Sequence, residues 1–119
     1  MKRGAIALIL VLLAGCQPGG ALKVTRMSGG VVRFELNGDG SCLNSIRIAY
    51  ADTYDEAGVM WSISQRDRSK DCFKSIDYPV APKGFEVEAT AKPLAPGRYW
   101  VTGKAEEFYL SGDLDIPSS

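Results

Sequence analysis

A two-residue alternation of apolar and polar side chains runs through the chain from Leu22 to Ile116. Between Val32 and Leu36, for example, three apolar residues are separated by one arginine and one glutamate. This period places every second side chain on the same side of an extended strand, whereas an amphipathic helix repeats about every 3.6 residues. The sequence therefore predicts strands with one apolar face, and it contains no stretch typical of an amphipathic helix.

Turn-forming residues interrupt this alternation at short intervals. Ser28 to Gly30 and Asn37-Gly38 are typical of tight turns, and Pro79 and Pro82 break the chain before a later strand. About seven short strands remain between these breaks, which is the pattern of an all-β sandwich or of a small antiparallel barrel. The side chains expected on the inner faces are Val32, Phe34, Leu36, Ile46, Ile48, Trp61, Ile63, Val87, Val101, Phe108 and Leu110.

The most patterned stretch of the chain lies at residues 94–99. Leu94, Pro96, Gly97 and Tyr99 resemble the Leu-x-Pro-Gly-x-Tyr corner of many immunoglobulin-like and fibronectin-type sandwiches. The resemblance implies that the Tyr99 hydroxyl bonds back to nearby backbone. We therefore expect a small antiparallel β-sandwich of the immunoglobulin-like type, with the small antiparallel barrel as the alternative. A fold of this kind implies no activity.

The amino-terminal stretch has the order of a secretory signal peptide. Lys2 and Arg3 precede a run from Ala5 to Ala14 without a polar side chain, and small residues follow. This run is much shorter than the ~20 residues that span a bilayer as a helix. Leu13-Ala14-Gly15-Cys16 resembles the lipobox of bacterial lipoproteins.

The lipobox resemblance implies a processed, lipid-anchored protein. Cleavage before Cys16 would leave this cysteine as the first residue, with diacylglycerol on its sulfur and an acyl chain on its amine. Gln17 follows it in place of aspartate, the usual inner-membrane retention signal of that family, so the resemblance implies the outer membrane, with the domain facing the periplasm. We expect a signal peptide at residues 1–15, a lipidated tether at 16–21 and a single β domain at 22–119.

Charge and composition argue against several classes of function. The chain has 14 basic and 14 acidic residues and no histidine. Without a basic cluster there is no electrostatic footprint for nucleic acid, so we expect no nucleic-acid partner. The missing histidine removes the commonest general base and the commonest metal ligand, and no G-x-S-x-G elbow is present. We therefore predict no enzymatic activity, no metal and no cofactor.

Two cysteines remain once Cys16 is assigned to lipid. Cys42 and Cys72 lie in a chain that the signal peptide would send to an oxidising compartment, where an even remainder predicts a disulfide. If the strands around Ile46 and Trp61 form a hairpin, both cysteines lie near its open end. The predicted bridge is structural, because no C-x-x-C motif accompanies it.

Two aromatic residues fall at outward positions of consecutive predicted strands. Trp100 alternates with Tyr99 and Val101, and Tyr109 occupies an outward position on the following strand. If these strands form a hairpin that turns near residues 103–106, the two aromatic residues are directly opposed or diagonal. They then either stabilise the hairpin as a cross-strand pair or contact a protein, peptidoglycan or glycan partner. The polar rim of such a contact would be Arg98, Lys104 and Glu107.

These expectations favour a binding protein of the cell envelope. The first hypothesis is a membrane-anchored, non-enzymatic binding or assembly module with an envelope protein partner. The alternative is an inhibitor or immunity protein that acts against a lysozyme or a toxin. In that case the polar segment from Gln65 to Asp71 would be the inserted loop.

Overall fold

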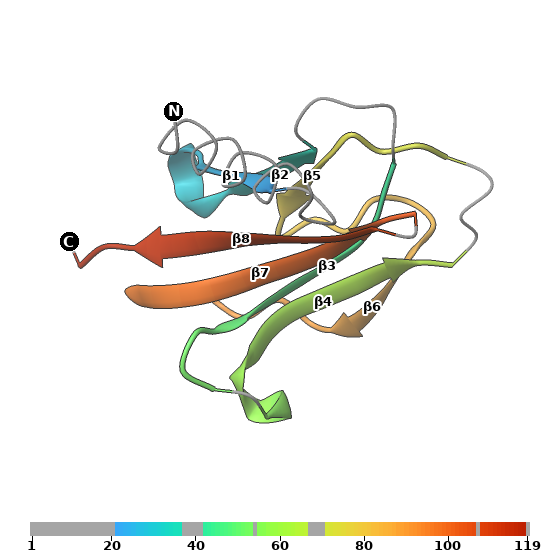
Figure 1. Ribbon diagram of the computed structural model, residues 1–119. Coiled ribbons are helices and arrows are strands. Elements are labelled where there is room, and N and C mark those ends of the chain that lie inside the picture. The colour runs from blue at the N-terminus through green and yellow to red at the C-terminus, as the bar shows by residue number, and fades with distance from the viewer. Residues whose placement is uncertain (1–20, 37–41, 54, 67–70, 107, 119) are drawn as a thin grey trace, which may run out of the picture.

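The computed structural model describes residues 21–36, 42–53, 55–66, 71–106 and 108–118. The described residues form eight strands and two short 3-10 helices, arranged as two layers of antiparallel sheet (Figure 1). The predicted signal peptide, Cys16 and Gln17 lie outside the described residues. The elements are β1 (Leu22–Arg26), η1 (Ser28–Gly30), β2 (Val32–Leu36), β3 (Leu43–Tyr50), η2 (Glu56–Gly58), β4 (Val59–Gln65), β5 (Ser75–Tyr78), β6 (Phe85–Ala89), β7 (Gly97–Ala105) and β8 (Phe108–Ile116).

The strand order is that of an open sandwich. One sheet has the order β1-β2-β5, the other has the order β6-β4-β3-β7-β8, and all neighbours are antiparallel. In the lettering used for immunoglobulin-like sandwiches, β1, β2 and β5 correspond to A-B-E, and β3, β7 and β8 to C-F-G. The predicted sandwich is confirmed, and the described strands do not close into the alternative barrel. The sequence had indicated about seven strands, and β5 is the additional one.

The core between the sheets is built mainly from the expected side chains. Trp61 of β4 is 1% exposed, and its ring packs edge-on against Tyr78 of β5 at 5.4 Å between centroids. Burial of a large apolar side chain contributes about 1.5–3 kcal/mol to stability. The predicted inner residues that are buried are Val32, Phe34, Ile46, Ile48, Trp61, Ile63, Val101 and Leu110.

Three expected inner residues differ from the prediction. Val87 and Phe108 are 48% and 55% exposed, and Leu36 is only partly buried against the core. Val87 lies on β6, the edge strand of the wider sheet, away from the three-stranded sheet (Figure 1). Phe108 is the first residue of β8, at the end of the sandwich. The predictions for Val87 and Phe108 were wrong because a sheet of three strands does not cover every inward position of a sheet of five.

The predicted tyrosine corner is present at the start of β7. The hydroxyl of Tyr99 donates a hydrogen bond to the backbone oxygen of Ala95, four residues upstream. Its ring is 1% exposed and stacks on Tyr50, with 5.0 Å between the ring centroids. Burial, followed by the neighbouring Tyr50 hydroxyl, raises the pKa of Tyr99 to about 12. The corner therefore fixes the entry into β7, the strand that carries Trp100.

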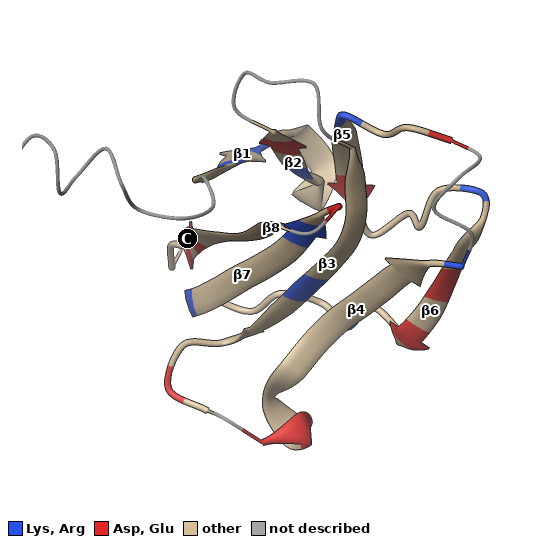
Figure 2. Ribbon diagram, turned by 45° about the vertical axis from the view of Figure 1, so that its right-hand side comes forward, with Lys and Arg blue, Asp and Glu red and all other residues tan. Residues whose placement is uncertain are grey.

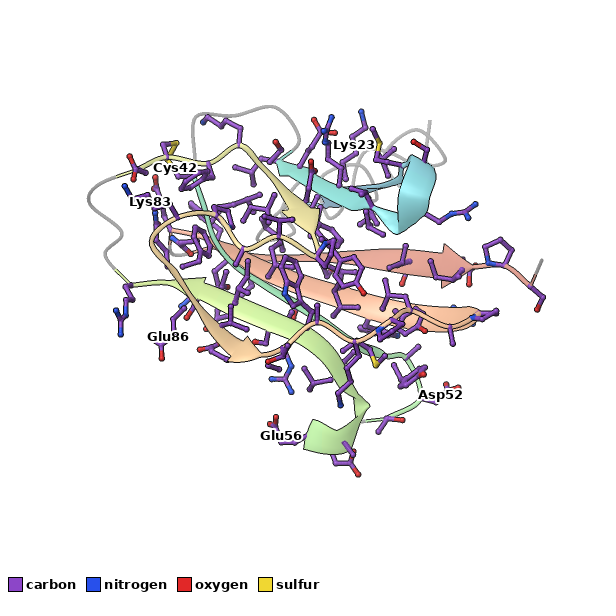
Figure 3. All side chains as sticks on the ribbon, turned by 180° about the vertical axis from the view of Figure 1, so that it is seen from behind. Lys23, Cys42, Asp52, Glu56, Lys83 and Glu86 are labelled. Carbon is purple, nitrogen blue, oxygen red and sulfur yellow. A yellow bond between two sulfur atoms is a disulfide. The ribbon has the colours of Figure 1, made fainter. Side chains whose placement is uncertain are left out.

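The predicted disulfide joins Cys42 and Cys72 at one end of the sandwich (Figure 3). The two Cα atoms are 5.0 Å apart across 30 residues of sequence. Next to the bridge, the backbone N–H of Leu43 donates to the carbonyl of Phe73 at 2.7 Å. Closing a loop of this length stabilises a fold by about 3–4 kcal/mol in the chain-entropy model. The bridge thereby ties the start of β3 to the segment that leads into β5.

Candidate functional site

The five-stranded sheet has one face that packs on the core and one face directed to solvent, here called the outer face. Alternation along each strand decides which side chains reach it, because neighbouring residues point to opposite sides. Figure 2 shows that basic residues lie on the central strands β3 and β7, whereas the edge strand β6 carries acidic residues. The outer face is formed by Ser45, Arg47, Ala49, Ser62, Ser64, Glu88, Trp100, Thr102, Lys104, Tyr109, Ser111 and Asp113.

Both predicted binding residues project from the outer face. Trp100 is 53% exposed and Tyr109 is 72% exposed, as the alternation had indicated. In the ladder between β7 and β8, Trp100 is paired with Asp113, and Lys104 is paired with Tyr109. The two aromatic residues are therefore four positions apart along the strands, or about 13 Å at the usual rise of a strand.

The prediction that the two aromatic residues lie next to each other is wrong. The prediction placed the turn near residues 103–106, but β7 continues to Ala105 and β8 begins at Phe108. The later turn shifts the register, so that Val101 is paired with Gly112. Because the two rings are neither opposed nor diagonal, they do not stabilise the hairpin as a cross-strand pair.

Two shallow hollows lie on the outer face, and each has one of the two aromatic residues in its wall. The Trp100 hollow has a volume of about 240 Å³ and is bounded on its other sides by Ala49, Ala51 and Thr53. The Tyr109 hollow has a volume of about 200 Å³ and is lined by hydroxyl and charged groups. Arg47 and Thr102, which are paired in the ladder between β3 and β7, line both hollows. The hollows are therefore adjacent parts of one surface.

A carboxylate is held in place within the Tyr109 hollow. The Ser62 hydroxyl donates to one oxygen of Glu88 at 2.8 Å, and the Ser64 hydroxyl donates to the other at 3.1 Å. Glu88 comes from the edge strand β6, and both serines come from its neighbour β4. An ionised carboxylate has about four lone-pair sites, so each oxygen of Glu88 keeps acceptor capacity for a ligand.

Two cations complete the outer face. The guanidinium of Arg47 lies 3.6 Å from a carboxylate oxygen of Glu56, and both groups are well exposed, so this pair contributes little to stability. The ammonium group of Lys104 lies over the Tyr109 ring, 5.2 Å from its centroid. This cation–π contact holds the ring in position over the sheet. Arg47 therefore keeps most of its donors available at the boundary between the two hollows.

The remaining predicted residues are only partly described. Arg98 lies on the same side of β7 as Trp100, where it is paired with Asp115. Glu107 lies outside the described residues, as do residues 67–70 of the predicted inhibitor loop. At the ends of that loop, the side-chain amide of Gln65 donates to the backbone oxygen of Asp71 at 2.9 Å.

The outer face brings together several kinds of polar and aromatic group. It combines hydroxyl, carboxylate, guanidinium and aromatic groups. In the described part of the chain no three His, Cys, Asp or Glu side chains come together as a metal site. The sequence did not indicate Arg47, Glu88 or Thr102, because their neighbourhood depends on strand pairing rather than on a motif. Their outward positions in the alternation of apolar and polar residues were the sequence signal that could have identified them.

No described helix has the length and apolar character needed to cross a bilayer. Comparison of the chain with protein-family models, curated proteins and solved structures finds no match. An immunoglobulin-like sandwich hosts many unrelated functions, so the fold alone assigns none. The geometry of the outer face is therefore the guide to function.

Proposed function

We propose that this protein is a non-enzymatic binding module of the bacterial cell envelope, held at the membrane by lipid on Cys16. Its binding surface is the outer face of the five-stranded sheet. The observation that carries the proposal is the pair of exposed aromatic residues, Trp100 and Tyr109, projecting from this one face on either side of the two hollows. The partner is a component of the envelope within reach of the anchored domain.

The aromatic residues support binding because the fold does not require them where they are. Neither ring is buried, and the register separates them by four positions. Trp, Tyr and Arg are the residue types that most often dominate the energetics of recognition surfaces, and the outer face carries all three types in Trp100, Tyr109 and Arg47. Aromatic side chains that are more than half exposed, as these two are, have surface available to a partner.

The position at the membrane is supported by the lipobox resemblance and by the short tether. Each buried CH₂ of an acyl chain contributes about 0.8 kcal/mol, and one chain alone binds only marginally. The three chains implied by the resemblance would make attachment permanent. Residues 16–21 would then keep the domain close to its bilayer, and Gln17 favours the outer membrane and the periplasm.

The proposal is tested by crosslinking the native lipoprotein in intact cells. After purification, bound proteins are identified by mass spectrometry and bound glycan by sugar analysis. We expect one envelope component to be retained by the wild type and lost from Trp100→Ala and Tyr109→Ala. The matched control is Phe108→Ala, since Phe108 is similarly exposed but lies on the other side of the sheet. Equal retention by all three variants would refute the outer face as the binding surface.

A second candidate is an inhibitor or immunity protein against a lysozyme or a toxin. The observation that favours it is the closure of the loop at residues 65–71 by the hydrogen bond from Gln65 to Asp71, next to Cys72. A loop with fixed ends can enter an enzyme cleft with little loss of entropy. Lysozyme or toxin activity that excess purified protein leaves unchanged would exclude this function.

A further inference from the structure

We infer that the ligand of the outer face is an oligosaccharide of at least two linked sugar rings. This inference rests on the proposed function and names the chemical class of the partner. The geometry that leads to it is the succession of Trp100, the shared pair Arg47 and Thr102, and Tyr109 across two adjacent hollows.

Each hollow offers the two kinds of contact that a sugar ring makes. A sugar ring has faces of C–H groups, which pack on the negative face of an aromatic ring, and an edge of hydroxyl groups. Trp100 lines one hollow together with Tyr50, Tyr109 lines the other, and the polar residues Arg47 and Thr102 line both. The separation of about 13 Å along the strands is more than one sugar ring can span, so the ligand must be a chain of rings.

The polar groups match hydroxyls rather than an ionic ligand. A sugar hydroxyl both donates and accepts, so its site needs donors and acceptors close together. Arg47 supplies donors only, Glu88 supplies acceptors only, and the Thr102 hydroxyl supplies both. Cations and a carboxylate line the Tyr109 hollow together, so neither a polyanion nor a polycation finds a complementary surface there. A neutral chain of hydroxyl groups meets no such conflict.

The floor of the outer face argues for a sugar chain rather than a protein partner. Protein interfaces are depleted of serine and alanine at their core, and their hot spots cluster in desolvated central pockets. Here the row of residues midway between the two aromatic residues consists of Ser62, Arg47, Thr102 and Ser111, three of which carry small hydroxyl side chains. Small side chains let a ligand approach the sheet closely, and their hydroxyls keep the floor wet.

The test is a titration of the purified full-length lipoprotein in detergent. The probes are chitotetraose, cellotetraose and a tetrasaccharide from peptidoglycan, with N-acetylglucosamine as the single-ring control. The chain has two tryptophans, Trp61 buried and Trp100 exposed, so a change in tryptophan fluorescence reports on the outer face. We expect at least one tetrasaccharide to bind and to shift this fluorescence. N-acetylglucosamine should bind at least about tenfold more weakly.

Variants assign the binding to the two hollows. Trp100→Ala and Tyr109→Ala should each weaken tetrasaccharide binding by about tenfold, measured by calorimetry. Glu88→Gln keeps the shape of the side chain but weakens its acceptors, and it should weaken binding by a smaller factor. Phe108→Ala should leave the affinity unchanged. Unchanged thermal melting of the Trp100 and Tyr109 variants shows that a lost affinity is not a lost fold, because both side chains are exposed.

The outcomes separate this inference from the proposed function. If no tetrasaccharide binds at about 10 mM, or if binding survives both aromatic substitutions, the oligosaccharide assignment is overturned. Equal affinity for N-acetylglucosamine overturns the requirement for linked rings. If the crosslinking experiment then still finds a protein partner that depends on Trp100, the binding face stands and only its ligand class was wrong. If neither experiment depends on Trp100, the proposed function fails as well.

Discussion

The two tryptophans lie in the same five-stranded sheet but on its opposite faces. Trp61 is buried and packs edge-on against Tyr78 of the other sheet. Trp100 is more than half exposed, and none of the aromatic contacts among the described residues involves it. The comparison separates two reasons for having a large aromatic residue. The first tryptophan is part of the core, whereas the second has no ring contact within the described part of the chain.

The largest expected difference is between the two tryptophan truncations. Trp61→Ala leaves a cavity between the sheets and should lower the free energy of unfolding by about 3–5 kcal/mol. Trp100→Ala removes an exposed side chain and should change it by less than about 0.5 kcal/mol. Urea unfolding followed by circular dichroism measures both. If Trp61→Ala does not fold, Trp61→Phe provides a milder version. Similar losses for the two positions would mean that Trp100 supports the fold after all.

Gly112 and Ser111, which are neighbours on β8, also lie on opposite faces of the sheet. A Cβ at Gly112 would lie 2.9 Å from the backbone oxygen of Leu22 and equally close to a methyl carbon of Val24. Gly112→Ala should therefore force β1 away from β8 and lower the free energy of unfolding by about 1–3 kcal/mol. Ser111→Ala, one residue away on the outer face, should have almost no effect. Thermal melting measures the stability of the two variants. Equal melting temperatures would contradict the close contact between Gly112 and β1.

Much of the inner face was predictable because burial imposes a period on the sequence. The alternation identified Trp61 and seven other core residues, and the cysteine count identified the disulfide. The strand β5 was missed because Ile76 and Tyr78 provide only two apolar positions in four residues, too few for a convincing period. Val87 and Phe108 have the right period but lie where the smaller sheet does not cover the larger one.

The outer face was less predictable, because it depends on register. The sequence placed Trp100 and Tyr109 on one face, but a later turn moved them four positions apart. A polar outer residue carries little information of its own, since most such residues are only solvated. Glu88 became notable when strand pairing placed Ser62 and Ser64 within hydrogen-bond distance of it. Contacts between distant segments are what the periodicity of one strand cannot supply.

The hydroxyl groups of Tyr99, which is buried, and Tyr109, which is exposed, give a smaller test. The hydroxyl of Tyr99 donates to the carbonyl of Ala95, whereas Tyr109 is exposed on the outer face. Tyr99→Phe leaves that carbonyl without its donor and should lower the free energy of unfolding by about 1–2 kcal/mol. Tyr109→Phe should be neutral. Urea unfolding measures both variants, and a neutral Tyr99→Phe would show that the corner is held by packing alone.

Alkaline pH gives a second test of the tyrosine corner, because ionisation of Tyr99 should destabilise the folded chain as the pH rises. The pKa of Tyr99 is raised to about 12 in the folded chain from an ordinary value of 10.0, so the unfolded chain ionises first. The stability that this group contributes is therefore complete below pH 10 and is lost as the pH rises toward 12. Tyr99→Phe should show a weaker loss of stability over that window in pH-dependent urea unfolding. Identical pH profiles would contradict the raised pKa.

The smallest expected effect is a difference in melting temperature between charge substitutions on the outer faces of the two sheets. On the three-stranded sheet, Arg33 and Asp77 form two parallel hydrogen bonds of 2.9 and 3.1 Å, so their charges are satisfied within the chain. This hydrogen bonding lowers the pKa of Asp77 below its ordinary value of 3.8. On the five-stranded sheet, by contrast, the one ion pair of Arg47 among the described residues is the long contact with Glu56. A partner should therefore gain more from the second face than from the first.

Asp77→Asn should lower the melting temperature slightly at neutral pH, because a partly exposed ion pair contributes at most about 1 kcal/mol. A lowered folded-state pKa stabilises the protein above pH 3.8, and that contribution is lost as the pH falls through the folded value. The melting curves of wild type and variant should therefore converge in acid. Asp113→Asn, on the outer face of the wider sheet, should leave the melting temperature at neutral pH unchanged. An equal effect at Asp113 would mean that this face is also stabilised internally, and its charges would then be less available to a ligand.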